Sequence, residues 1–240
     1  MDTIKKISPL PVALILSVFL LFTLSCSDNG ENSSQPQVED QKPTFSFFEV
    51  GKNSLLSNKL RNDLSKMLGD DAVETRTTID LTINNKAFFE KHFPHFYRLN
   101  RQLNSQTGER VEHNTVNIAF RYAETKNLPF EYAGFLFSRY TNQPLLIRAN
   151  FKKDQLSIID TLKEKYGPPK ILPWDRKAGR SLCWRKEKDL LVVSSIPGEF
   201  GNPDYEMAIY FAHALERLIA TEQQKNEKKN APKSPVKKVF

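Results

Sequence analysis

Glu90, His92 and His95 have a spacing that a metal site can use. They form the pattern Glu-x-His-x-x-His, and two histidines three residues apart on one helical face can hold a metal ion. Pro94 lies between the histidines, however, and no second cluster of ligands is evident in the chain. Surface or half-buried histidines without a metal are therefore favoured.

Three other groups of residues have types that occur in active sites. His213 and Glu216 are one helical turn apart, as on an ordinary polar helix face. Ser194 and Ser195 follow an apolar run but lack the Gly-x-Ser-x-Gly pattern of serine hydrolases. The segment RKAGRS, 176–181, has one glycine, too few to cradle a phosphate, and is most simply a hairpin loop. We therefore predict no catalytic, cofactor-binding or metal-binding residue and no enzymatic activity.

Cys26 follows an export leader. Lys5 and Lys6 precede an apolar run over 10–24, and a polar segment begins after the cysteine. A charged start followed by a short apolar run is typical of a signal peptide. The run is shorter than the roughly 20 residues that a membrane-spanning helix needs. The pattern predicts a signal peptide over residues 1–25 that is removed after export.

The residues Thr23, Leu24, Ser25 and Cys26 resemble the cleavage box of bacterial lipoproteins. This resemblance implies that Cys26 becomes the acylated first residue of the mature protein, anchored in the membrane by fatty acids such as palmitate. In such lipoproteins the second mature residue affects sorting, and Ser27 implies the outer membrane, facing the periplasm, over the inner membrane. An uncleaved signal anchor and simple secretion are the alternatives.

Composition predicts one folded domain between two disordered segments. Residues 26–44 are polar and proline-containing and predict a lipidated N-terminus on a flexible tether. Residues 45–221 form the predicted domain, with possible halves at 45–151 and 152–221. Residues 222–240 contain six lysines and two glutamates and predict a basic, disordered tail. An exported chain without a structured basic face is not expected to bind nucleic acid, and Cys183 is expected to pack as a small apolar residue.

The first half shows one helix pattern and several strand patterns. Leucines at three- and four-residue spacing predict a helix that is capped by Asn53 or Ser54 and ends at Gly69. Alternating apolar residues predict a half-buried strand over 75–83. Residues 86–103 predict a helical excursion that Pro94 starts or kinks. Further alternation predicts strands over 116–122, 133–137 and 145–151 in an antiparallel meander.

The second half repeats this order. A helix capped by Asp154 ends at Gly167, and a hairpin over 181–196, a strand over 205–211 and a closing helix over 212–224 follow. The ends of the two predicted helices, 60–71 and 158–169, match in apolar spacing and final glycine. Shared capping chemistry alone can produce this match. The predicted fold class is α+β, an antiparallel sheet packed by helices, with two helix-plus-three-strand repeats as an option.

The order FSFFEVGKNS, helix, LKEKYGPP, LCW and LLVV resembles a group of bacterial envelope lipoproteins whose second helix ends in Tyr-Gly-x-Pro before a tryptophan hairpin. The layout resembles that of β-lactamase-inhibitor-type proteins and of small lipoproteins that assist outer-membrane assembly. The resemblance gives Gly167, Pro169 and Trp184 structural roles and implies no catalytic residue. It implies a non-enzymatic module of the cell envelope that binds a protein or peptide.

The aromatic residues of 86–103 leave one question open. Phe88, Phe89, Phe93, Phe96 and Tyr97 are more than one helix face can bury. They therefore predict either core packing or an exposed patch for a partner or an acyl chain. The alternative to a protein-binding module is an exported enzyme or a carrier of small ligands or lipids with a pocket on the sheet face.

Overall fold

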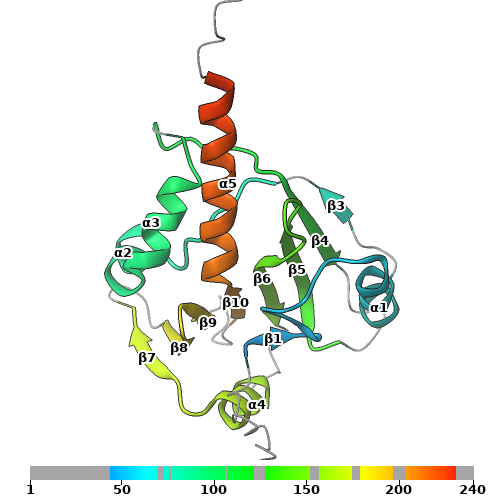
Figure 1. Cartoon of the computed structure of the whole chain (residues 1–240). Helices are drawn as coiled ribbons and strands as arrows, with labels where there is room; N and C mark the ends of the chain where they lie inside the picture. The colour runs from blue at the N-terminus through cyan, green and yellow to red at the C-terminus, as the bar shows by residue number, and fades with distance from the viewer. Residues whose placement is uncertain are drawn as a thin grey trace, which may run out of the picture. The chain divides into compact units, whose positions relative to one another are not determined.

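Eight strands of the described chain form one sheet in the order β3-β4-β5-β6-β10-β9-β8-β7 (Figure 1). The computed structural model describes residues 44–69, 73–75, 77–105, 107–121, 128–151, 157–174, 179–196 and 204–230. The strands are β3 Val73–Thr75, β4 Thr115–Arg121, β5 Phe130–Ser138, β6 Pro144–Phe151, β7 Lys170–Pro173, β8 Arg180–Lys186, β9 Asp189–Ile196 and β10 Asp204–Tyr210. All neighbouring pairs are antiparallel. Together with the helices packed on this sheet, they confirm the predicted α+β class.

The sheet consists of two four-stranded meanders that meet where β6 pairs with β10. The helix α1, Asn58–Leu68, precedes the first meander, and α4, Ser157–Tyr166, precedes the second. Both helices end at a glycine with positive φ, 112° at Gly69 and 80° at Gly167. Each glycine amide donates to the carbonyl of the residue four positions earlier. Each half thus has four strands, one more than in the optional helix-plus-three-strand repeat, because β7 was not anticipated and β3 lies before the segment 77–83.

The helix α1 begins later than predicted. Its N-cap is Ser57, whose hydroxyl accepts a hydrogen bond from the amide of Leu60 at 3.2 Å. Ser54, one of the predicted caps, instead accepts from the amide of Gly51 at 2.9 Å and closes the turn after a small hairpin. That hairpin pairs β1, Ser46–Phe47, with β2, Val50–Gly51. Asp154, the predicted cap of α4, lies outside the described residues.

The two faces of the sheet are covered by different parts of the chain. On one face, the ring of Phe47 from the hairpin stacks on Phe135 of β5 at 6.0 Å. On the same face, the indole of Trp184 donates to the carbonyl of Gly167 at the end of α4, at 2.7 Å. Residues alternate between faces along a strand. Tyr210 of β10 points to the face opposite to that of Phe135 and Trp184. There it packs on Phe96, with ring centroids 5.1 Å apart.

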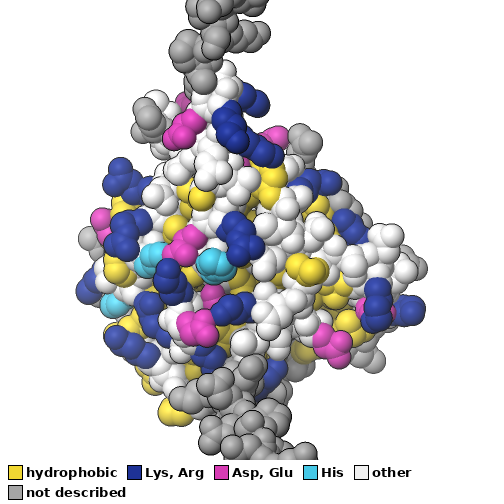
Figure 2. Space-filling view, in the orientation of Figure 1, with side chains coloured by type: hydrophobic (Ala, Val, Ile, Leu, Met, Phe, Trp, Pro, Cys, Tyr) yellow, Lys and Arg dark blue, Asp and Glu magenta, His cyan; other side chains and the backbone are white. Residues whose placement is uncertain are grey.

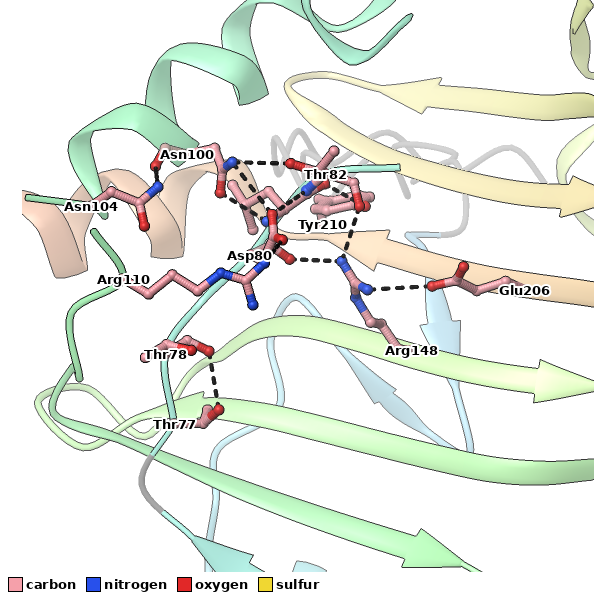
Figure 3. A network of polar contacts seen from close by, with 11 residues as sticks. Thr77, Thr78, Asp80, Thr82, Asn100, Asn104, Arg110, Arg148, Glu206 and Tyr210 are labelled. Carbon is pink, nitrogen blue, oxygen red and sulfur yellow. Dashed lines mark hydrogen bonds and ion pairs between the residues drawn. The ribbon is translucent and has the colours of Figure 1, made fainter. Parts of the chain in front are cut away.

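Residues 77–83 are extended, but the prediction that they form a sheet strand is wrong. The alternating side chains of Ile79, Leu81 and Ile83 are buried, as expected. Within its described part, however, this segment forms only one isolated β-bridge, between Thr78 and Glu112. The segment crosses over the strands of the sheet, as Figure 3 shows. The alternation therefore reflects burial beneath helices and not strand pairing.

The predicted helical excursion consists of two helices, α2 and α3, and its aromatic residues belong to the core. α2 is Lys86–His92 and α3 is Pro94–Gln102, so that Pro94 is the first residue of the second helix. Phe88, Phe89, Phe93 and Phe96 are at most 4% exposed. Phe96 packs on Tyr210 of β10, and the ring of Phe88 lies 6.3 Å from that of Trp174, so rings from both helices face the interior. The exposed-patch alternative is therefore wrong for these four rings.

The closing helix α5, Ala212–Asn230, is longer than predicted and extends into the segment expected to be disordered. The carboxylate of Asp189 on β9 accepts a hydrogen bond from the amide of Ala212 at 2.9 Å. It thereby satisfies one of the amides that a helix start leaves unpaired. None of the described helices is long and apolar enough to cross a membrane.

A buried ion pair attaches α5 to the loop before β4. His113 is 7% exposed, and its Nδ1 lies 2.6 Å from the carboxylate of Glu222. Its Nε2 lies 2.8 Å from the carbonyl of Leu103. Two acceptors, one at each ring nitrogen, favour the doubly protonated imidazolium. The carboxylate of Glu222 also accepts from the amide of Asn114 at 3.1 Å.

The pKa values of this pair move in opposite directions. Burial alone lowers the pKa of His113, but the hydrogen bond and charge of Glu222 and the bond to Leu103 outweigh it, and the pKa lies above its ordinary 6.5. Burial alone raises the pKa of Glu222, but the hydrogen bonds from His113 and Asn114 and the nearby positive charges hold it below 4.5. The contribution of His113 to the stability of the fold is lost as pH rises through its raised pKa. The contribution of Glu222 is lost as pH falls through its lowered pKa. The pair stabilises the fold most between pH 4.5 and 6.5.

We expect the substitution Glu222→Gln to have a pH-dependent effect on stability. At about pH 5.5 it should lower the free energy of unfolding by about 1–2 kcal/mol, since hydrogen bonds to charged groups are worth that much after solvent screening. At about pH 9 the difference from the natural protein should be smaller, because His113 loses its positive charge as pH rises through its raised pKa. Urea unfolding at both pH values measures this. An equal difference at both would show that the pair is not ionised.

Candidate functional site

Along residues 80–82, side chains form the hydrogen bonds to the main chain that a neighbouring strand forms in a sheet (Figure 3). Arg148 of β6 donates to the carbonyl of Asp80 at 2.7 Å, and the hydroxyl of Tyr210 on β10 donates to the carbonyl of Leu81 at 3.0 Å. The side-chain oxygen of Asn100 on α3 accepts from the amide of Leu81 at 2.9 Å. Buried main-chain groups need such partners. These bonds therefore hold the segment in place between the sheet and α3.

The carboxylate of Asp80 lies at the centre of this network. It accepts hydrogen bonds from the amide of Thr82 at 2.9 Å and from the amide nitrogen of Asn100 at 3.4 Å, and it forms an ion pair with Arg110. Burial alone would raise the pKa of Asp80, but the bonds to Thr82 and the charges of Arg110 and Arg148 outweigh it and hold the pKa below 3.8. Asp80 is therefore ionised at neutral pH and is a poor proton acceptor.

The loop after α3 holds Arg110 in position. The amide of Ser105 donates to the carbonyl of Glu109 at 2.8 Å, and Asn104 bridges to Arg110. Gly108 has a φ of 84°, a conformation that glycine adopts at little cost. This tight turn reverses the chain and directs it back along residues 78–80. Arg110 consequently reaches the carboxylate of Asp80 from the opposite side to Arg148.

An open cleft of about 1040 Å³ lies over this network, between α3, the 104–110 loop and α5. We call it the cationic cleft. Its charged lining side chains are Asp80, Lys86, Arg98, Arg101 and Arg110. Its uncharged lining residues are Thr82, Tyr97, Asn100, Gln102, Asn104, Ser105, Thr107, Gly108 and Gln223. The lining is therefore almost entirely polar, with Tyr97 as its one aromatic ring.

The cleft has an excess of positive charge. Arg110 is neutralised by Asp80. Lys86, Arg98 and Arg101 are exposed, and within the part of the chain that the structure describes their side chains make no ion pair or hydrogen bond. Arg98 and Arg101 are three residues apart and so share one face of α3. Arginine forks and hydroxyl and amide groups are suited to carboxylates and other anions. The chemistry that this lining supports is anion recognition.

Figure 2 shows a face of the molecule on which histidine side chains lie near acidic ones. Glu216 of α5 contacts His95 at 3.3 Å and Lys188 at 3.1 Å, with His213 at 3.9 Å. His92 does not join them and lies against the ring of Phe88, with centroids 4.6 Å apart. Among the described residues, no three His, Cys, Asp or Glu side chains are placed to hold a metal ion.

The remaining candidate side chains are structural. Ser194 is buried and shares a hydrogen bond with Ser181 at 3.1 Å, which in turn accepts from the indole of Trp174 at 3.0 Å. Cys183 is buried, and burial raises the pKa of its thiol to about 12. The prediction that it packs as a small apolar residue is confirmed. Of the segment 176–181, the described residues begin at 179, where the chain enters β8.

Sequence reasoning placed no site at the cationic cleft. Arg98 and Arg101 lie in the aromatic-rich segment 86–103, and Asp80 lies between apolar residues of the strand predicted over 75–83. The available signal was the pair of arginines on one helix face without acidic residues at helical spacing. Cys26, the one predicted modification site, lies outside the described residues. No protein-family model, curated protein or solved structure matches this chain.

Proposed function

We propose that this protein is an exported lipoprotein, anchored in the outer membrane through Cys26, whose domain binds an acidic protein or peptide segment in the cationic cleft. On this proposal it acts by binding and catalyses no reaction. The leader over 1–25 and the likeness of residues 23–26 to a lipoprotein cleavage box support the anchor. The proposed orientation places the domain in the periplasm.

The observation that carries the binding proposal is the convergence of three cations without partners on one open cleft. Lys86, Arg98 and Arg101 line it, and the single carboxylate, Asp80, is already neutralised by Arg110. The surplus charge attracts anionic partners over distances of about 10 Å at ordinary salt.

The size and polarity of the cleft favour a macromolecular partner. Small-molecule pockets are mostly apolar and enclose about 300–1,000 Å³, whereas this cleft is open, polar and about 1040 Å³. An extended acidic segment can place several carboxylates along it at once. The amide and hydroxyl side chains of Gln102, Asn104 and Thr107 would then bind main-chain groups of the segment.

We expect the double substitution Arg98→Glu and Arg101→Glu to weaken binding of an acidic peptide about tenfold or more, because a loss of 1.4 kcal/mol is tenfold in affinity. The measurement is calorimetric titration of the purified full-length protein with a peptide of about ten residues rich in Asp and Glu. Binding to the natural protein should also weaken as salt is added.

The matched control is the pair Lys66→Glu and Arg180→Glu, at two exposed positions outside the cleft. This pair changes the net charge of the protein by the same amount. The proposal requires the control to keep most of the affinity. Equal weakening by both pairs would show that only net charge matters and that the cleft is not the site.

A further inference from the structure

A second hollow, separate from the cationic cleft, lies at the end of β8. It has a volume of about 290 Å³, at the small end of the range for small-molecule pockets. Six of its lining residues carry the inference: His92, Tyr166, Lys170, Trp184, Arg185 and Lys186. They come from the end of α2, the end of α4 and the strands β7 and β8. The hollow therefore lies at one edge of the sheet.

The hollow exists because β8 is longer than the strand beside it. β7 begins at Lys170, opposite Cys183, whereas β8 continues to Lys186. The chain reaches β7 from α4 through two prolines, Pro168 and Pro169. The bond from the indole of Trp184 to the carbonyl of Gly167 fixes this connection beside the strand. At Arg185, β8 therefore extends beyond its ladder with β7.

The main chain of Arg185 faces this gap. β8 and β9 are joined by the two residues Glu187 and Lys188, and Glu187 has a φ of 52°. In such hairpins the two residues that flank the turn, here Lys186 and Asp189, form two main-chain hydrogen bonds with each other. The main-chain amide and carbonyl of the next residue along β8 point away from β9. The amide and carbonyl of Arg185 therefore point toward Pro168. Among the described residues, no main-chain carbonyl accepts a hydrogen bond from the amide of Arg185.

The charges around the hollow have one sign. Lys170, Arg185 and Lys186 line it, and among the described residues no Asp or Glu does. Arg185 lies over the ring of Phe93 at 5.5 Å and donates to the carbonyl of His92 at 3.0 Å. Lys186 lies over the ring of Tyr166 at 4.8 Å. These contacts fix two of the cations beside aromatic rings before any ligand binds.

We propose that this hollow binds a carboxylate attached to a flat apolar group. The carboxylate accepts hydrogen bonds from Lys170 and from the main-chain amide of Arg185, and the apolar group packs against the exposed ring of Pro168 beside Tyr166. The volume holds about one aromatic amino acid. Such a group is either the C-terminal residue of a peptide or a free small acid.

The test uses the full-length protein and calorimetric titration with N-acetylphenylalanine. We expect binding to this acid and at least tenfold weaker binding to the neutral N-acetylphenylalaninamide. Lys170→Glu should weaken binding of the acid at least tenfold, whereas the control Lys66→Glu should leave it unchanged. Lys170 is exposed, so the variant should fold, and a thermal melt verifies this. Equal binding of acid and amide, or no effect of Lys170→Glu, would overturn the proposal.

Two further probes distinguish the source of the carboxylate. A tetrapeptide with a C-terminal phenylalanine represents a chain end, and 3-phenylpropionate represents a free small acid. Tighter binding of the tetrapeptide assigns the hollow to peptide ends, and tighter binding of phenylpropionate assigns it to small acids. Failure of both to bind contradicts the site. Because Arg98 and Arg101 do not line this hollow, the result is independent of the cationic cleft.

Discussion

The double substitution Phe93→Ser and Phe96→Ser is expected to unfold the protein. Phe93 is 1% exposed and Phe96 is fully buried against Tyr210. Replacing one such ring by a small residue costs about 3–5 kcal/mol, and serine adds a hydroxyl that must be buried. A typical domain is stable by only about 5–15 kcal/mol. Circular dichroism during heating should show no cooperative transition.

Each single substitution should lower the melting temperature, and Leu55→Ser provides the control. Leu55 is also a large apolar residue but is 57% exposed, so its replacement should change stability by less than about 0.5 kcal/mol. A folded Phe93→Ser, Phe96→Ser protein that had only lost a partner would contradict the core assignment. It would restore the alternative that these rings form an interaction surface.

The substitution Cys26→Ala is expected to release the protein from membranes or to leave its uncleaved precursor in them. An acylated cysteine contributes about 0.8 kcal/mol for each buried methylene, and two or more chains make attachment nearly irreversible. Without the thiol no chain can be added. Cell fractionation, with incorporation of labelled fatty acid, measures both effects.

Cys183→Ala is the matched control, because Cys183 is the other cysteine of the chain and is buried in β8. It should leave both the label and the membrane attachment unchanged. Equal labelling of the Cys26→Ala protein would mean that Cys26 is not the lipidated residue. Loss of the label in Cys183→Ala alone would show that Cys183, and not Cys26, is the modified cysteine.

Elements with a local signal could be predicted from the sequence. Helix ends at Gly69 and Gly167 follow from the positive φ that both glycines adopt. Strands β4, β5 and β6 follow from apolar residues at every second position, and the β8–β9 hairpin from its short polar turn. In each case a few neighbouring residues determine the local conformation. The predicted and observed elements then agree closely.

Elements that depend on distant residues could not be predicted. The alternation over 77–83 shows which side chains are buried, but the segment is held by Arg148, Tyr210 and Asn100, which come from three other elements. The edge strand β7 is short and ends at Pro173, so it has little pattern of its own. Its place in the sheet follows from its pairing with β8.

The cationic cleft was missed for the same reason. Its residues come from the crossing segment, α2, α3, the 104–110 loop and α5. On the sequence alone, Arg98 and Arg101 look like any solvated helix face. The 104–110 loop places Arg110 beside Asp80. This contact between distant residues determines which cations of the cleft are neutralised and which are not.

The most direct test of the binding account is site-specific photocross-linking in intact cells. A photoreactive residue replaces Gln102, which lines the cleft and is uncharged, and in a second protein it replaces Asn62, an exposed residue of α1. We predict one discrete adduct from position 102, with the link in an acidic segment of the partner, and none from position 62. The adduct should disappear with Arg98→Glu and Arg101→Glu. The same adducts from both positions, or an adduct that survives the charge reversal, would contradict the account.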